Sequence, residues 1–287
     1  QVRKQALETF GEIGFPTRRQ EEWRFTDVSP IAKREFSLVA DQQVTAVDWQ
    51  PFSVDAKVPR LVFVNGRYQA ELSNRDVALP KGVTFKPLSE AQQQNTQVME
   101  PHLDKHVNLR ENGFVALNTA FMHEGVFLHV PKGVVLETPL QVLYLTQTDT
   151  ADVVTHPRNL ILVGENAQAA LLESYGSTSE ARHFTNPVTE VYVAENAVFD
   201  HYKIQQEHKK SFHTGLIQVY QQRASRFASH NYAFGSQIAR NDLNITLDGE
   251  GADAILNGLY LANGKQLIDN HSVIDHAQPH CTSKEVY

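Results

Sequence analysis

The side chains best suited to chemistry lie close together near the end of the sequence. Residues 269–281 hold three histidines, two aspartates and the only cysteine of the chain. Imidazole, thiolate and carboxylate groups bind transition metals once they are deprotonated. We therefore take His276, His280 and Cys281 as candidate metal ligands, with His271 as a neighbour that belongs to a partial site or to a subunit interface.

The spacing of these residues argues against a complete metal site made by this segment alone. On a strand, His271 and His276 are an odd number of residues apart, so their side chains would face opposite sides. His276 and His280 have matching parity, but Pro279 interrupts any strand between them. We expect at most a partial site, which residues elsewhere or a second subunit would complete.

The sequence shows no pattern of a catalytic serine elbow, a metalloprotease helix or a phosphate-binding loop. No catalytic residue is therefore predicted, and the residues of any cofactor site stay unknown. An enzyme would need three converging ligands and an open coordination position, for which Asp275, His276 and His280 are the available groups. The alternative to a non-enzymatic protein is a metal-dependent hydrolase or lyase that uses the cluster between His271 and Cys281.

The composition narrows the class of protein. The chain has 287 residues, of which 41% are hydrophobic, so it can bury a core and is not disordered throughout. A formal charge of −7 argues against a nucleic-acid-binding protein, and no apolar stretch is long enough to span a membrane. A single cysteine excludes an internal disulfide framework and any cluster site built from several thiolates of this chain. It also predicts a reducing, cytoplasmic location.

The elements that must position these residues follow a repeat. From about residue 125 onward, short β-rich runs alternate with small polar turns, and the alanines at 167, 197, 224 and 252 in these turns are 30, 27 and 28 residues apart. Units of strand, turn, strand and polar connection are typical of a β-solenoid, in which each coil buries its apolar face against its neighbours. An antiparallel barrel or sandwich is the competing architecture. A carbohydrate-binding solenoid ranks last, because the tyrosines do not keep the repeat period.

The first part of the chain has a different texture. Apolar residues at helical spacing predict a helix over residues 2–13, which Gly14 ends. The run 61–64 followed by Asn65-Gly66 predicts a strand and a tight turn. We divide the chain into an N-terminal helical region (1–58), a strand and helix connector (59–124) and a mainly β core (125–287).

Several motifs resemble those of a known family. Residues 16–26, PTRRQEEWRFT, resemble a signature near the start of SufD-type chains of the SufB/SufD family, and residues 61–68 are similar to the strand and turn that follow there. The run 269–287, with its D-N-H, D-H and P-H-C-T-S groups, resembles a later motif of the same family. The chain is identified as a member of the SufB/SufD family, on its SufD side, because SufB chains commonly carry several cysteines and this chain has one.

The resemblance implies a right-handed parallel β-helix core, an N-terminal helical region and a C-terminal helical region that is missing here. It implies a non-catalytic scaffold subunit of the SufBCD iron–sulfur cluster assembly complex, which supports iron acquisition. A SufB-like subunit would pair with the β-helix end, and a SufC-like ATPase would dock on the missing region; a homodimer is the other possible assembly. Iron or an iron–sulfur cluster is expected at the level of the complex, with no cofactor on this chain alone. Because the sequence starts at Gln1 and stops at Tyr287 in mid-pattern, we expect a fragment.

Overall fold

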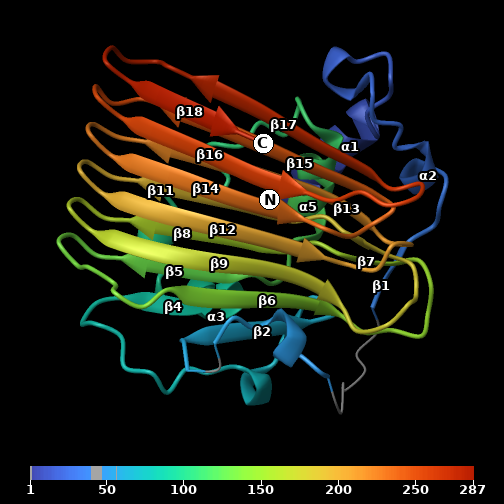
Figure 1. Cartoon of the computed structure of the whole chain (residues 1–287), viewed down its shortest axis with the longest axis horizontal. Coiled ribbons are helices and arrows are strands. Elements are labelled where there is room, and N and C mark those ends of the chain that lie inside the picture. The colour runs from blue at the N-terminus through green and yellow to red at the C-terminus, as the bar shows by residue number, and fades with distance from the viewer. Residues whose placement is uncertain (1, 40–46, 56) are drawn as a thin grey trace.

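Two β-sheets, wound from one continuous path, form the body of the protein (Figure 1). The computed structural model describes residues 2–39, 47–55 and 57–287; the remaining residues, all within the predicted N-terminal region, lie outside the described part. The helical elements are α1 (Val2–Ile13), η1 (Glu21–Trp23), α2 (Ser29–Ala32), η2 (Gln50–Phe52), η3 (Ala70–Leu72), α3 (Leu88–Gln94), α4 (Thr96–Met99) and α5 (Gly113–Phe121).

We name the sheets A and B. The ten strands of sheet A are β1 (Ser37–Leu38), β4 (Thr84–Pro87), β5 (Val126–Val130), β7 (Val153–Thr155), β8 (Arg158–Val163), β10 (His183–Thr185), β11 (Val188–Val193), β13 (Phe212–Gln221), β15 (Ile238–Leu247) and β17 (Leu267–Asp275). The eight strands of sheet B are β2 (Arg60–Val64), β3 (Arg67–Tyr68), β6 (Leu140–Thr146), β9 (Gln168–Ser177), β12 (Val198–Gln206), β14 (Arg226–Ala233), β16 (Asp253–Tyr260) and β18 (Thr282–Val286).

The chain alternates between the sheets, so each coil adds one parallel strand to each of them. In sheet A, Val191 pairs with Ile161 of the previous coil and Val219 of the next, and all three side chains enter the core between the sheets. In sheet B, Phe199 stacks on Phe227 with ring centroids 6.1 Å apart. Among the described strands, only the pairs β2–β3 and β4–β5 are antiparallel. The predicted β-solenoid is confirmed, and the barrel or sandwich is wrong.

The repeated turns share one backbone feature, which corrects the alanine period. Left-handed φ values of 53° to 73° occur at Asn166, Asn196, Ala224 and Gly251. The residue after each of them is buried, and these residues are Ala167, Ala197, Ser225 and Ala252. Ala224 therefore occupies the left-handed position, and Ser225 takes the place that alanine has in the other coils. Asparagine and glycine tolerate this conformation well, which explains why they recur there.

The N-terminal segments cover the outer face of sheet A and, around Trp49 and Phe52, the strands β2 and β6 of sheet B, and they leave the later strands of sheet B open. Leu88 and Met99 of α3 and α4 pack on Leu160 and Leu162 of β8. Trp23 packs in a second apolar cluster, which includes the first residues of β13 and β15, Phe212 and Ile238. In Figure 1, strands β9 to β16 of sheet B face the viewer with no helix in front of them. The segment 59–124 is not separate from the β core, because it adds β2 and β3 to sheet B and β4 to sheet A. The division of the chain at residues 58 and 124 stays a prediction.

A fully buried arginine holds the connector on sheet A. The Arg158 Nη2 atom lies 2.5 Å from Asp104 Oδ1 and 2.6 Å from Glu190 Oε1. Its Nη1 atom donates to the side chains of Asn118 and Thr119 in α5. A buried guanidinium needs its charge to be paired, and here both Nη atoms are satisfied while the Nε atom has no hydrogen-bond partner.

Replacing Arg158 alone should lower the free energy of unfolding more than replacing both members of its ion pair with Glu190. Arg158→Met leaves Glu190 buried without its cation, and we expect a loss of about 3–5 kcal/mol in the free energy of unfolding. The double variant Arg158→Met/Glu190→Gln should recover part of that loss. Urea unfolding followed by circular dichroism measures both, and equal losses in the single and the double variant would contradict this account.

Candidate functional site

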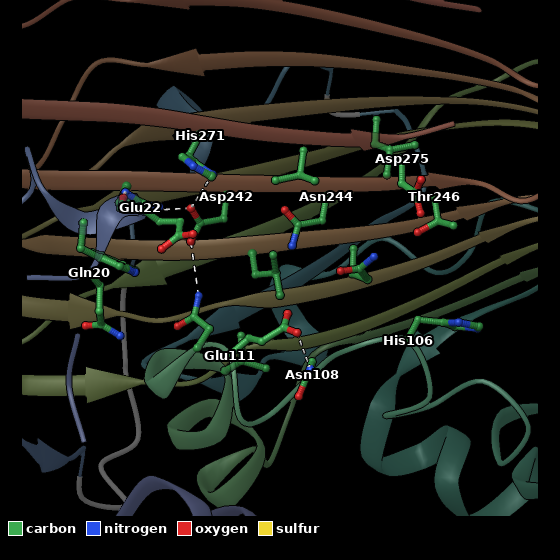
Figure 2. A pocket seen from close by; sticks show the side chains of 18 residues that line it. Gln20, Glu22, His106, Asn108, Glu111, Asp242, Asn244, Thr246, His271 and Asp275 are labelled. Atoms are coloured by element: carbon green, nitrogen blue, oxygen red, sulfur yellow. Dashed lines mark hydrogen bonds and ion pairs between the residues drawn. The ribbon is translucent and has the colours of Figure 1, made fainter. Parts of the chain in front are cut away.

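A cleft of about 540 Å³ lies between the outer face of sheet A and the N-terminal segments (Figure 2). Its floor consists of polar side chains that point outward from β13, β15 and β17, among them Gln218, Asn244, Thr246 and Asp275. Its walls come from the segment around η1 and from the loop 106–112. His271 and Asp275 of the predicted C-terminal cluster line this cleft.

One end of the cleft is closed by a clasp between Arg240 and Trp23. The Arg240 guanidinium lies 3.9 Å from the centre of the Trp23 ring, a close cation–π contact. The same guanidinium donates to Asp242 Oδ1 at 2.8 Å and to Asp269 Oδ2 at 2.6 Å. The Thr26 hydroxyl also donates to Asp269. The N-terminal motif noted in the sequence is thus attached to β15 and β17.

His271 faces the acidic side of this clasp. Its Nδ1 atom lies 3.9 Å from Asp242 Oδ1, and Asn112 donates to the other carboxylate oxygen. Burial raises the pKa of Asp242, while the charge of Arg240 opposes that rise. Both oxygens of Asp242 already accept hydrogen bonds, one from Arg240 and one from Asn112. At this end of the cleft, Asp242 therefore offers no free carboxylate oxygen that could join His271 in binding a metal ion.

The other predicted ligands lie apart from this cleft. His276 follows β17 and its Nε2 atom is 3.0 Å from the Ser283 hydroxyl. His280 is exposed, with its Nε2 atom 3.9 Å from Glu250 Oε1. Cys281 packs against the core, and its Sγ atom is 3.3 Å from the Gly249 carbonyl oxygen.

In residues 2–39, 47–55 and 57–287, no group of three or more His, Cys, Asp and Glu side chains is arranged to hold a metal ion. A site that a second subunit would complete with His276, His280 and Cys281 stays a prediction.

The interior of the solenoid contains a polar cluster that the sequence analysis missed. Glu173 on β9 is fully buried and accepts hydrogen bonds from the Tyr175 hydroxyl and from the Thr189 hydroxyl of sheet A. The His201 Nε2 atom lies 2.8 Å from its other oxygen. Burial by itself would raise the pKa of Glu173, but the hydrogen bond and charge of His201 and the charge of Lys203 lower it overall.

A second buried carboxylate lies on the same side of the interior. Glu207 follows β12, and its Oε2 atom is 2.8 Å from His213 Nδ1, while its Oε1 atom accepts from the Thr185 hydroxyl. Burial opposes ionisation, yet the charge of His213 and hydrogen bonds from His183 and His213 hold the pKa of Glu207 well below its usual range. Both carboxylates are therefore ionised inside the protein.

Lys203 supplies the positive charge between these carboxylates. Its Nζ atom donates to Asn241 Oδ1 at 2.7 Å, and Asn241 in turn donates to Asn270 on β17. Asn231 donates to the same Asn270 oxygen. The signal for this cluster was the alternation in β12, where Phe199, His201, Lys203 and Gln205 all point inward.

Within the described ranges, no helix combines the length and the apolar character that a membrane crossing requires.

Comparisons with known proteins agree on one family. The family model for the SufBD protein N-terminal region matches residues 1–142, and the model described as SUF system FeS cluster assembly, SufBD core domain, matches residues 145–287. An iron–sulfur cluster assembly SufBD family protein of Synechocystis is 29% identical, with 99% of this chain and 64% of that protein covered. The iron–sulfur cluster assembly protein SufD of Escherichia coli is 23% identical, with the same two shares.

A relative from Arabidopsis thaliana, named Protein ABCI7, chloroplastic, is 24% identical, with 100% of this chain and 61% of that protein covered. The chain thus spans less than two thirds of the length of these relatives.

Loss of the clasp should release the N-terminal segment from the cleft. Arg240→Met removes the cation that holds Trp23 and Asp269, so we expect red-shifted tryptophan fluorescence and faster tryptic cleavage within residues 18–24. Arg223→Met is the matched control, because Arg223 makes only an exposed pair with Glu195 and should change stability by less than about 0.5 kcal/mol. Cleavage at the same rate in both variants would contradict the clasp.

The interior cluster predicts a two-stage loss of stability in acid. The pKa of His213 is lowered by burial from 6.5, so the unfolded chain takes up a proton that the folded protein does not, and stability should decrease as the pH falls below about 6.5. Glu173 and Glu207 have lowered pKa values, so their contribution is present above about 4.5 and is lost below it.

Chemical denaturation across this pH range tests both stages. Glu207→Gln should lower stability at neutral pH and flatten the second stage. A wild-type curve that is level from pH 7 to pH 4 would rule the account out.

Proposed function

The chain belongs to the SufBD family of iron–sulfur cluster assembly proteins, and from this premise we propose that it is a non-enzymatic scaffold subunit of a SufBCD-type complex. The observation that carries the proposal is that the two family models match both parts of the chain, 1–142 and 145–287, and that these parts form one β-solenoid. The sequence motifs and the relative named SufD favour the SufD side of the family.

We propose that a SufB-like subunit pairs with the end of the solenoid formed by β17 and β18. Among the described strands, each of these two pairs on one side only, so its backbone donors and acceptors on the other side can accept a further strand. Large apolar side chains are exposed in the last coil, namely Leu259, Leu261, Val273, Val286 and Tyr287. This combination supports a strand-pairing contact with an apolar flank. A second copy of this chain is the other occupant to be tested.

A SufC-like ATPase would dock on the helical region that the resemblance assigns to the family after the β-helix. Iron or a cluster would be handled by the complex as its cargo, with His276, His280 and Cys281 as this chain's contribution near the same end. We also propose a cytoplasmic location, while the Arabidopsis relative is named as a chloroplast protein.

Co-purification of three proteins tests this proposal. The natural full-length protein, mixed with a SufB-like and a SufC-like protein, should capture both, and the 287-residue chain should lose SufC. Val286→Arg places a charge on the apolar flank of β18 and should weaken SufB capture at least tenfold. Val135→Arg, at an equally exposed valine of the opposite end, is the control.

Two outcomes would contradict the proposal. One is capture of SufC by the 287-residue chain as strongly as by the full-length protein. The other is absence of SufB binding by either chain while the isolated chain retains stoichiometric metal through His276 and His280, which would favour a metal-dependent enzyme.

A further inference from the structure

Three side chains inside the solenoid have the arrangement of a nucleophile, its base and the group that orients the base. The nucleophile is the Lys203 amine, which is 1% exposed. The base is His213, whose Nδ1 atom lies 2.8 Å from the ionised Glu207 carboxylate. An Nδ1–H donor to Glu207 leaves the lone pair on Nε2, and this Nε2 atom is buried without a hydrogen-bond partner.

Gly215 of β13 brings the amine and the base together. The point where a Cβ atom would stand on Gly215 lies 2.6 Å from Lys203 Nζ and 3.1 Å from His213 Nε2. Both nitrogens therefore lie over the same glycine, and any side chain there would crowd both of them. The missing side chain creates the space in which a proton can move from the amine to the imidazole.

The electrostatics favour the reactive forms of both groups. Burial lowers the pKa of Lys203 to about 8, although the charges of Glu173, Glu207 and Asp242 oppose that change. Burial and the nearby Lys203 charge lower the pKa of His213, so the imidazole is neutral at neutral pH. Above about pH 8 the Lys203 amine is therefore neutral beside a neutral imidazole, and the neutral amine is the form that acts as a nucleophile.

The one electrophile in contact with this amine belongs to the protein itself. Lys203 Nζ is 2.7 Å from Asn241 Oδ1, so the amide carbon of Asn241 lies one bond beyond a direct contact. The Asn241 amide nitrogen is held at 3.2 Å by Asn270 Oδ1. Because the amine is buried, an outside substrate cannot reach it, whereas the Asn241 amide is already in contact with it.

We propose that Lys203 and Asn241 join through an intramolecular isopeptide bond between β12 and β15. The neutral Lys203 amine nitrogen forms a bond to the Asn241 side-chain carbonyl carbon, and His213 Nε2 accepts the proton that this nitrogen loses. The bond from that carbon to Asn241 Nδ2 breaks, and the nitrogen takes the proton from His213 and leaves as ammonia. The net change is one lysine amine and one asparagine amide converted to one secondary amide and one ammonia, with no oxidant or cofactor.

Such a bond would tie sheet B to sheet A in the middle of the solenoid. It closes a loop between two residues 38 positions apart, so it would restrict the unfolded chain as a disulfide does. A cytoplasmic protein with one cysteine cannot use a disulfide for this purpose. The proposal is independent of the scaffold function and of any partner.

Mass spectrometry of the wild-type chain decides the question. After incubation above the Lys203 pKa of about 8, the chain should be lighter than its sequence by one ammonia molecule. Lys203 would then resist trypsin, so residues 183–209 should appear joined to residues 241–265 in the digest. A wild-type chain that keeps its full sequence mass, with free peptides ending at Lys203, overturns the proposal and leaves the cluster a structural one.

Variants distinguish the two residues that would form the bond, Lys203 and Asn241, from the residue that would act as the base, His213. Lys203→Met and Asn241→Ala should each keep the full sequence mass. Asn231→Ala removes the buried amide that pairs with Lys203 on the next strand and donates to Asn270 instead of the amine, so this variant should still lose ammonia. His213→Gln should slow the loss of ammonia by about 10²-fold or more, as expected when a general base is removed. Ammonia loss at the wild-type rate in His213→Gln, or loss in Asn241→Ala, would overturn the assignment.

Discussion

The structure depends on one constraint, which is that every charge inside the solenoid must be satisfied by other side chains inside it. Glu173, Glu207 and Lys203 are all fully buried, and an unpaired charge in such a place costs several kcal/mol. Their partners come from both sheets and from neighbouring coils. The network therefore fixes which strand faces which, because a slip of one residue would turn a buried charge toward solvent and an apolar residue out of the core.

The interior consequently has two halves with different tasks. On the side of the repeated turns, Val191, Phe199 and their equivalents form stacked apolar rows that supply burial energy. On the other side, where the strands of sheet B end and those of sheet A begin, the inward positions are polar. Apolar rows can accept a slip of two residues, which keeps the same face inward, whereas a hydrogen-bonded network cannot. The same principle fixes the outer segments. Arg158 of sheet A pairs with Asp104 of the connector, and Arg240 of sheet A holds the Trp23 ring and the Glu22 carbonyl oxygen.

The solenoid could be predicted because the turns recur at a regular spacing in the sequence. Each turn needs a residue that tolerates the left-handed backbone conformation, followed by a small buried residue. The sequence pattern misplaced one coil, since Ala224 satisfies the composition of the turn while occupying a different backbone position. The polar cluster was not predicted for a physical reason. In β12 both faces carry polar side chains, with Asp200 outside and His201 inside, so alternation alone does not reveal which face is buried. The parity argument for His271 and His276 agrees with their separate environments, but the clasp at Arg240 required knowledge of contacts across more than 200 residues.

The division of the interior also bears on what can pair with the last coil. Ile274 belongs to the apolar half and Asn270 to the polar half, and both point inward from β17. Glu285 of β18 accepts a hydrogen bond from Ser272, so the polar half extends to this last pair of strands. A strand that continues the sheet must place apolar groups over Ile274 and hydrogen-bonding groups over Asn270. A partner in the wrong register would bury polar groups without partners, and that penalty is larger than the gain from a generic apolar contact. Any strand added beyond β17, from this chain or from a partner, must therefore satisfy the buried polar half as well as cover the exposed apolar side chains.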